Sequence, residues 1–286
     1  MASIREMRLR IKSVKSLAQV TKALETVSAS KVRKAVQANQ ASKPYSEKAW
    51  KVLLHLARQP GHNNLHPLLN ERPLVRKILV VMISGDRGLA GSYNVNVLRN
   101  TLMYFDKFSQ QVDYVCVGKK GRDLLLRRRA NVIAEFTDLN NPATFLEISP
   151  ISHLIVDDFL NEGHDQFYIS YTEFESMTKQ NTVIRKILPL EVDYSGKGPN
   201  ATHESGNSVF TYEPDQRELL DEIIPRFTAM QIYQSILSSQ ASEHAARMVS
   251  MSNATENANE LGGLLQLEYN KARQQSITND MLDIVG

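Results

Sequence analysis

Three glycines at intervals of three residues, beginning at Gly85, lie in the segment 84–94 (SGDRGLAGSYN). Glycine-rich turns that lead into a helix can bring backbone N–H groups close to a phosphate, so this loop is the first candidate for chemistry. Its spacing matches neither the dinucleotide-binding fingerprint nor the Gly-Lys-Ser/Thr ending of a P-loop. A tight turn explains the spacing better. In a third interpretation the loop docks on another surface through Asp86 and Arg87, which are both charged.

The remaining groupings of reactive side chains are weaker. His62 and His66 are four residues apart, but the surrounding Pro-, Gly- and Asn-rich stretch does not favour a helix that would place them on one face. Cys116 is the only cysteine, so no disulfide can form within the chain. No serine-nucleophile elbow, HExxH pattern or pair of catalytic carboxylates stands out. We therefore expect no catalytic residue, no metal site and no cofactor.

A basic cluster lies between residues 119 and 129. It could bind a nucleic acid or an acidic protein surface, but it lacks the interleaved aromatic residues of a base-stacking site. A solvated helix face is the simpler explanation. The cluster consists of Lys119, Lys120, Arg122, Arg127, Arg128 and Arg129.

The elements around these residues alternate between strands and helices, which predicts an open α/β sheet over residues 75–195. Within this α/β domain, we place the start of the third predicted helix near Ser149, with Pro150 at its first helical position. The segment 195–208 has the composition of a loop. The predicted strands are 76–83, 112–117, 132–136, 166–174 and 182–189, and the predicted helices are 95–108, 118–129 and 148–162.

Long helices are predicted at both ends of the chain, at 1–56 and 210–286. In the first, apolar residues recur at spacings of three and four, which is typical of a narrow seam that faces one partner helix. The net charge is +9 for residues 1–51 and −6 for residues 213–286, so the two ends are suited to pair with each other. The predicted seam consists of Ile4, Met7, Ile11, Val14, Leu17, Val20, Leu24 and Val27.

The last helix is rich in small and polar residues between 238 and 258. A helix of about 60 to 70 residues would measure about 90 to 105 Å, longer than a compact domain of this mass, so we expect it to protrude towards a partner. We interpret its small side chains, over residues 238–259, as keeping contact with a surrounding sleeve shallow, because no large apolar area is buried.

Composition leaves two other classes open. One is a nucleotide-binding α/β protein with a coiled-coil interaction stalk, and the other is a coiled coil that binds nucleic acid through its basic first helix. The acidic last helix and the neutral middle disfavour the second class. No stretch is apolar enough to span a membrane, and the N-terminus lacks the apolar core of a secretory signal.

The chain resembles the γ-subunit family of F-type ATP synthases over its whole length. The residues that carry the resemblance lie in the opening helix (Ile4 to Arg33), the glycine segment 84–94, the segment 212–215 (YEPD) and the terminal block. Within that block, SEHAARM begins at Ser242 and YNKARQ begins at Tyr269.

The resemblance implies an antiparallel coiled coil of the N- and C-terminal helices with an inserted Rossmann-like, open-sheet α/β domain. It implies a non-catalytic rotor shaft that couples proton-driven rotation of the c ring to conformational changes of the catalytic β subunits. The implied partners are the α and β subunits, the ε subunit and the c-subunit ring, with no nucleic acid and no direct nucleotide binding. Because Met1 directly precedes the opening helix, the implied location is the cytoplasmic face of a bacterial inner membrane.

Contact residues carried over from the family fall in three groups. The first group lies where the family's shaft meets the moving β-subunit loops, with Arg33 and Arg87 as further contacts; the second lies in the foot on the c ring, and the third lies where the upper shaft meets the catch region of the hexamer. Gly262 and Gly263 lie within the last helix, where we expect a soft or closely packed segment. The groups are Lys22, Leu24, Arg33 and Arg87; Phe210, Tyr212 and Glu213; and Arg273, Gln274 and Thr278.

Overall fold

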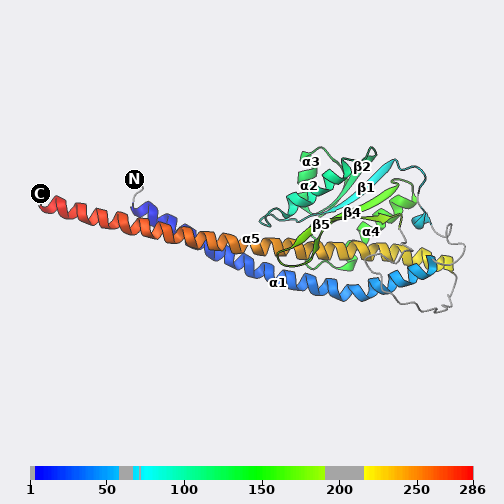
Figure 1. Cartoon of the computed structure of the whole chain (residues 1–286), viewed down its shortest axis with the longest axis horizontal. Coiled ribbons are helices and arrows are strands. Elements are labelled where there is room, and N and C mark those ends of the chain that lie inside the picture. Colours follow the sequence, from blue (N-terminus) through cyan, green and yellow to red (C-terminus); the bar gives the residue numbers. More distant parts are fainter. Residues whose placement is uncertain (1–3, 58–66, 71, 191–215, 286) are drawn as a thin grey trace.

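The computed structural model describes residues 4–57, 67–70, 72–190 and 216–285. Helix α1 (Ile4–Ala57) and helix α5 (Gln216–Val285) run antiparallel, side by side (Figure 1). A sheet domain lies against one end of the pair, and both chain termini lie towards the other end. The predicted fold class is confirmed: a long helix pair carries an α/β domain that is inserted between the two helices.

The seam of α1 follows a heptad repeat from Ile4 to Ala49. Every one of its positions is buried or half-buried, and many carry small or polar side chains. Hydrogen bonds link the seam to α5: the hydroxyl groups of Thr21 and Thr255 are 2.7 Å apart, and Arg8 donates to the Tyr269 hydroxyl at 2.9 Å. The seam consists of Ile4, Met7, Ile11, Val14, Ala18, Thr21, Glu25, Ser28, Val32, Ala35, Asn39, Ser42, Ser46 and Ala49.

The predicted seam is therefore correct as far as Val14 and wrong by one residue beyond it. Leu17, Val20 and Val27 are more than half exposed. A helix turns once every 3.6 residues, so repeated steps of three rotate the side chains away from the original face. A heptad alternates steps of three and four, and this alternation selects the neighbouring small residues instead.

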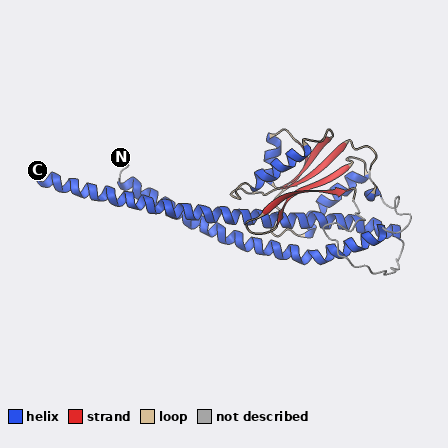
Figure 2. Cartoon of the chain, viewed as in Figure 1, coloured by secondary structure: helices blue, strands red, loops and turns tan. Residues whose placement is uncertain are grey.

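Five strands form one sheet in the order β3-β2-β1-β4-β5 (Figure 2). The first four are parallel, and β5 pairs with β4 in the antiparallel sense at one edge. The observed bounds are Lys77–Ile83 (β1), Gln111–Val117 (β2), Asn131–Phe136 (β3), Gln166–Phe174 (β4) and Gln180–Leu188 (β5).

Helices cover both faces of the sheet, and one of these helices is the shaft itself. Alternate residues of a strand point to opposite faces. Ile78, Val80 and Met82 pack towards α2 and α3, whereas Leu79 and Val81 pack into the core with α4 and α5. Helix α5 is therefore both half of the coiled coil and a layer of the α/β domain. The helix bounds are Tyr93–Phe105 (α2), Lys119–Arg127 (α3) and Phe145–Leu160 (α4), with a short 3-10 helix at Pro67–Leu69 (η2).

The predicted start of α4 is wrong. The helix begins one turn earlier, where Thr144 and Glu147 form a reciprocal capping box, and Pro150 lies inside the helix. A Thr-x-x-Glu spacing before an apolar run is a signal for a helix start, and this signal was overlooked in favour of the proline. Helix α2 likewise lies two to three residues earlier than predicted. The predicted loop 195–208 lies outside the described residues.

Candidate functional site

The glycine loop leaves the carboxyl end of β1 and is fixed to the neighbouring strand ends. The Asp86 carboxylate accepts the backbone N–H groups of Lys119 at 3.0 Å and Asp138 at 3.1 Å. Ser84 Oγ accepts the N–H of Gly121 at 2.9 Å. Asp86 is therefore engaged inside the protein, whereas Arg87 is exposed.

Two of the three loop glycines make room for α5. A Cβ on Gly85 would lie 2.6 Å from the Glu243 carboxyl group, and a Cβ on Gly91 would lie 2.9 Å from Ser250 Oγ. Gly91 also has a φ of +56°, a region that favours glycine. The close approach that these glycines permit is made by the protein's own shaft helix. The loop thus packs on α5 through its glycines and not through Asp86 and Arg87, so docking on another surface through those two charges stays a prediction.

The charged pair Glu243–Arg247 holds this contact. The two side chains are one helical turn apart on α5 and only 12% and 10% exposed. Arg247 also donates to the carbonyl oxygens of Gly88 at 3.3 Å and Arg87 at 3.4 Å. Burial raises the pKa of Glu243 above its ordinary value, and Arg247 opposes that shift. The guanidinium therefore satisfies a buried carboxyl group and the loop backbone at the same time.

Further polar residues of α5 bond the carboxyl end of β4, the loop after β3 and the first residue of α2. Burial raises the pKa of the Tyr93 phenol, whose oxygen lies 2.7 Å from Ser239 Oγ. We call residues 238–247 the docked segment. Its Gln240 side chain accepts the N–H of Ala143 and donates to the carbonyl of Asn140. Ser238 accepts the N–H of Phe174, and Ser242 donates to the carbonyl of Thr172.

The docked segment corrects the interpretation of the small residues 238–259. Its residues are buried or half-buried against the α/β domain, so they cannot face a surrounding sleeve. Their small size lets the helix approach the strand ends, and their hydroxyl groups satisfy loop N–H and carbonyl groups. The sleeve interpretation survives only for residues beyond the domain, from about Ser252 onwards.

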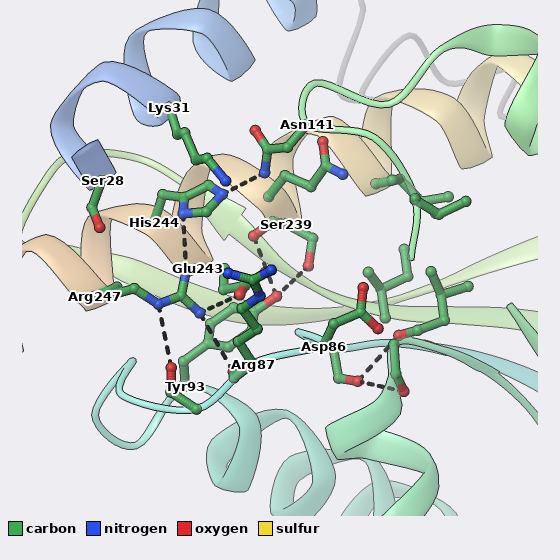
Figure 3. A pocket seen from close by; sticks show the side chains of 18 of the residues that line it. Ser28, Lys31, Asp86, Arg87, Tyr93, Asn141, Ser239, Glu243, His244 and Arg247 are labelled. Atoms are coloured by element: carbon green, nitrogen blue, oxygen red, sulfur yellow. Dashed lines mark hydrogen bonds and ion pairs between the residues drawn. The ribbon is translucent and has the colours of Figure 1, made fainter. Parts of the chain in front are cut away.

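A cavity of about 450 Å³ lies between α1, the glycine loop, the loop after β3 and α5 (Figure 3). Lys31 points into it from α1 and Arg87 points into it from the loop. His244 lies in its wall, between Asn141 and Arg247. Burial and the nearby Arg247 and Lys31 lower the pKa of His244 to about 3, so its ring is neutral near pH 7.

A second polar cluster lies at the opposite edge of the sheet. The buried His164 ring lies 3.0 Å from Asp113 and 2.7 Å from Asp158, and Asp165 pairs with Arg72. These groups join the amino ends of the strands and have a structural explanation. Within the described residues, no three His, Cys, Asp or Glu side chains are arranged to hold a metal ion. His62 and His66 lie outside the described residues.

Two of the six residues in the basic cluster form internal ion pairs, and Lys120, Arg127, Arg128 and Arg129 are exposed. Arg122 pairs with Asp123 and Glu135, and Lys119 pairs with Asp138. Cys116 is buried in β2, and burial raises the pKa of its thiol to about 12, so it is not a nucleophile near neutral pH.

The structure spreads the expected contact residues over the length of the molecule. Leu24 and Arg87 line the same cavity, and Lys22 is exposed and paired with Glu25 at 3.1 Å. Arg33 is exposed on α1. Arg273, Gln274 and Thr278 are exposed on α5, far from the sheet domain (Figure 1). Phe210, Tyr212 and Glu213 lie outside the described residues.

Glu243, Asn141 and Lys31 line the cavity but were not predicted as site residues from the sequence. A signal existed for the first, because a Glu and an Arg four residues apart within a run of Ala and Ser predict a helix pair on a closely packed face. No local signal marks Asn141, because its importance depends on a histidine about one hundred residues away in the chain.

The fold and the site define a class: a coiled-coil shaft to which an inserted α/β domain is fixed by polar contacts. The sequence profile of the family described as ATP synthase matches residues 3–286. The ATP synthase gamma chain of Dehalococcoides mccartyi is 43% identical over 100% of this chain and 98% of that protein. The ATP synthase gamma chain of a Roseiflexus species is 39% identical over 100% of this chain and 97% of that protein.

A similar fold occurs in a chain of the Euglena gracilis mitochondrial ATP synthase, solved as OSCP/F1/c-ring. The TM-score is 0.68 at 18% identity, with 99% of this chain and 92% of that chain covered. The rotor of the same complex gives a TM-score of 0.65, also at 18% identity, with 96% and 98% covered. This chain belongs to the ATP synthase gamma-chain family. A gamma chain is the non-catalytic rotor shaft of ATP synthase, a peripheral part of a membrane-associated complex.

Proposed function

We propose that this chain turns as one body, with the α/β domain driven from outside and the projecting helix pair forcing a surrounding hexamer through its conformations. The observation that carries the proposal is the double role of α5, which is a layer of the sheet domain and half of the shaft. Torque applied to the domain then passes into the shaft through the docked segment, without a flexible linker.

The proposed partners follow from the two similar structures, which are a rotor and an assembly of OSCP, F1 and c ring. We assign the α and β subunits to the projecting helix pair, and the ε subunit and the c ring to the α/β domain. None of the described helices combines the length and the apolar character that a membrane span requires. We place the chain on the cytoplasmic face of a bacterial inner membrane, in keeping with its bacterial relatives.

Specific contact residues are also proposed. Lys22, Leu24, Arg33 and Arg87 would meet the hexamer near the domain, and exposed basic side chains can attract acidic loops there without rigid interlocking. Arg273, Gln274 and Thr278 would meet its upper part. Phe210, Tyr212 and Glu213 remain the proposed contact with the c ring.

Reconstitution tests the proposal. The chain is mixed with the α and β subunits, and the mass and ATPase activity of the product are measured. We expect a complex with one copy of this chain and three of each partner, active only when this chain is present. If the chain stays free while its partners are competent, the shaft role is wrong. Binding of a nucleotide by the isolated chain would then favour the alternative, a nucleotide-binding α/β protein.

Charge reversal tests the contact residues. The double variant Lys22→Glu/Arg33→Glu is expected to lower coupled ATP synthesis more than assembly, because both side chains are exposed and bury little area. The matched control is Lys120→Glu/Arg127→Glu, the same change of charge on the exposed face of α3. Unchanged ATP synthesis in the shaft variant would remove these two residues from the contact.

A further inference from the structure

The cavity between α1 and the glycine loop contains two cationic groups that form no ion pair with any described residue, although Lys31 acts electrostatically on Glu243 and Arg87 on Asp138. Among the residues that the structure describes, no carboxylate forms an ion pair with Lys31 or Arg87. The two side chains come from different elements and point towards the same space (Figure 3). Two cations that converge in this way attract an anion.

The carboxylates that line the same cavity are already engaged. Glu243 pairs with Arg247, and Asp138 pairs with Lys119 at 2.7 Å. Asp86 accepts two backbone N–H groups from the neighbouring loops. Asp86 keeps its negative charge, so the two cations Lys31 and Arg87 exceed it by one positive charge once the two ion pairs are set aside.

The neutral ring of His244 fixes the orientation of Asn141. An arginine can only donate, so Arg247 donates to Nδ1 of His244 at 2.9 Å. The neutral ring therefore carries its proton on Nε2, and this N–H must donate to Asn141. We therefore assign the Asn141 amide with its oxygen facing the His244 ring. Its NH₂ group then lies on the side away from the ring, in a buried position where an oxygen would have no hydrogen-bond donor.

The groups that line the cavity and form no ion pair in the described part of the chain include two cations, the Lys31 ammonium and the Arg87 guanidinium, and beside them lies the Asn141 amide, whose outer atom is buried. The volume of about 450 Å³ lies within the range of small-molecule sites, about 300–1,000 Å³. We infer that this cavity is a binding site for a tetrahedral oxyanion of the phosphate class.

A bound oxyanion would join parts of the protein that are otherwise linked through α5. The interhelical hydrogen bonds of α1 run to α5, at Thr21–Thr255, Arg8–Tyr269 and Ser42–Gln234. Lys31 belongs to α1 and Arg87 belongs to the glycine loop, so an anion between them ties the first helix to the α/β domain directly. The site would stiffen the junction between shaft and domain when occupied.

Calorimetric titration of the full-length isolated chain with inorganic phosphate, at constant ionic strength, tests this inference. It requires no partner subunit, so it is independent of the proposed rotor role. We expect saturable binding at one site. Lys31→Gln should weaken binding about tenfold or more, because a hydrogen bond to a charged group is worth about 1.5–3 kcal/mol. The matched control, Lys34→Gln, removes an exposed lysine from the same helix and should leave binding unchanged.

Asn141→Asp is the sharpest variant. Its carboxylate still accepts the proton of His244 Nε2, but it replaces the NH₂ donor by a negatively charged oxygen. We expect phosphate binding to be lost while the fold, followed by thermal unfolding, is kept. Asn141→Ala should weaken binding less, because it removes a donor and adds no repulsion.

The competing outcomes are distinct. Phosphate binding that does not saturate, or that is equal in wild type, Lys31→Gln and Asn141→Asp, overturns the inference and leaves an adventitious ion only. ADP is titrated in a parallel arm. Binding of ADP with the same dependence on Lys31 and Asn141 identifies the phosphoryl group of a nucleotide as the source of the oxyanion. If only an acidic peptide binds with this dependence, the cavity is a protein-docking site and the inference is wrong.

Discussion

Two parts of α5 differ in composition and have opposite surroundings. The docked segment, 238–247, is covered by the sheet domain on one side and by α1 on another, and most of its residues are buried. In the bare segment, 259–279, a narrow seam faces α1, and Leu261, Leu264 and Leu267 are about half exposed or more. Small and polar residues are therefore closely packed in the docked segment, whereas large apolar residues are exposed in the bare segment.

This difference shows that the amount of apolar side chain does not decide where a helix is buried. In the docked segment, serine and arginine side chains form hydrogen bonds with backbone groups of β4 and of the glycine loop. In the bare segment, the three leucines keep about half or more of their surface exposed. The buried part of the helix fixes the domain, and the exposed part is available to other subunits.

The largest expected effect follows from breaking the buried ion pair. Arg247→Met should lower the free energy of unfolding by about 3 kcal/mol, because it leaves the Glu243 carboxyl group buried without its partner. Chemical denaturation measures this. Arg226→Met is the matched control, since Arg226 and Glu222 form the same i,i+4 pair but are 64% and 61% exposed. The control should change the free energy of unfolding by about 0.5 kcal/mol or less.

The loss in free energy of unfolding that Arg247→Met causes should increase as the pH rises. The folded-state pKa of Glu243 is already raised by burial, and the loss of Arg247 raises it further. The folded protein then holds a proton that the unfolded chain releases, so stability falls as pH rises above the ordinary value of 4.5. The cost should be larger at about pH 8 than at about pH 5. An equal cost at both values would contradict this description of the pair.

A smaller effect is expected from filling the docked contact. Ser242 is fully buried and donates to the Thr172 carbonyl at 3.1 Å. Ser242→Val adds volume and removes the donor, so we expect a loss of about 2 kcal/mol in thermal or chemical unfolding. Ser252→Val, at an exposed position of the same helix, is the control. Similar losses in both variants would mean that the docked segment is not tightly packed.

Alanine in place of glycine should act in opposite directions in the two parts of the molecule. Gly85→Ala should destabilise by about 1 kcal/mol or more, because its Cβ would lie 2.6 Å from a carboxyl group held by Arg247. Nothing lies within 4 Å of a Cβ at Gly263, so Gly263→Ala should stabilise the helix by about 1 kcal/mol. The melting temperatures of the two variants decide the signs. If Gly263→Ala destabilises, the bare segment has a packing constraint that the present contacts do not show.

The smallest effect is expected in the seam between the shaft helices. The hydroxyl groups of Thr21 and Thr255 bond each other and also bond carbonyl groups of their own helices. Replacing both by valine keeps their shape and removes both partners together, which is close to neutral, within about 0.5 kcal/mol. Unfolding of the double variant measures this. A loss of several times that size would show that the polar seam holds the shaft together.

Much of the fold could be predicted because periodicity is a local property. Strand β4 was predicted at its observed bounds, and the two long helices follow from the near absence of Pro and Gly. Errors arose where two local signals competed, as at Pro150 against the Thr144–Glu147 capping box. The predicted seam departs from the observed one at Leu17, because the large apolar side chain is exposed there and the small Ala18 is buried instead. At Gly262 the structure favours the soft alternative, since a Cβ there would meet Val14 at an ordinary 3.7 Å and close packing does not require glycine.

The candidate site was predicted in part. The glycine loop was singled out from its spacing, and docking was among its interpretations. The surface on which it packs could not be predicted, because Gly85 and Glu243 are brought together only by the long crossing of α5 over the sheet.

The sequence by itself determined the alternation of strands and helices, the two long helical ends, their opposite charges and the absence of an obvious catalytic motif, since each depends on residues close together in the chain. Only the tertiary structure decided which small residues are buried, that α5 belongs to both shaft and domain, and that Lys31, Arg87 and Asn141 share one cavity. The physical reason is that burial and electrostatic environment depend on distance in space. Residues that are far apart in sequence acquire their pairing partners, their pKa shifts and their functions only when the chain is folded.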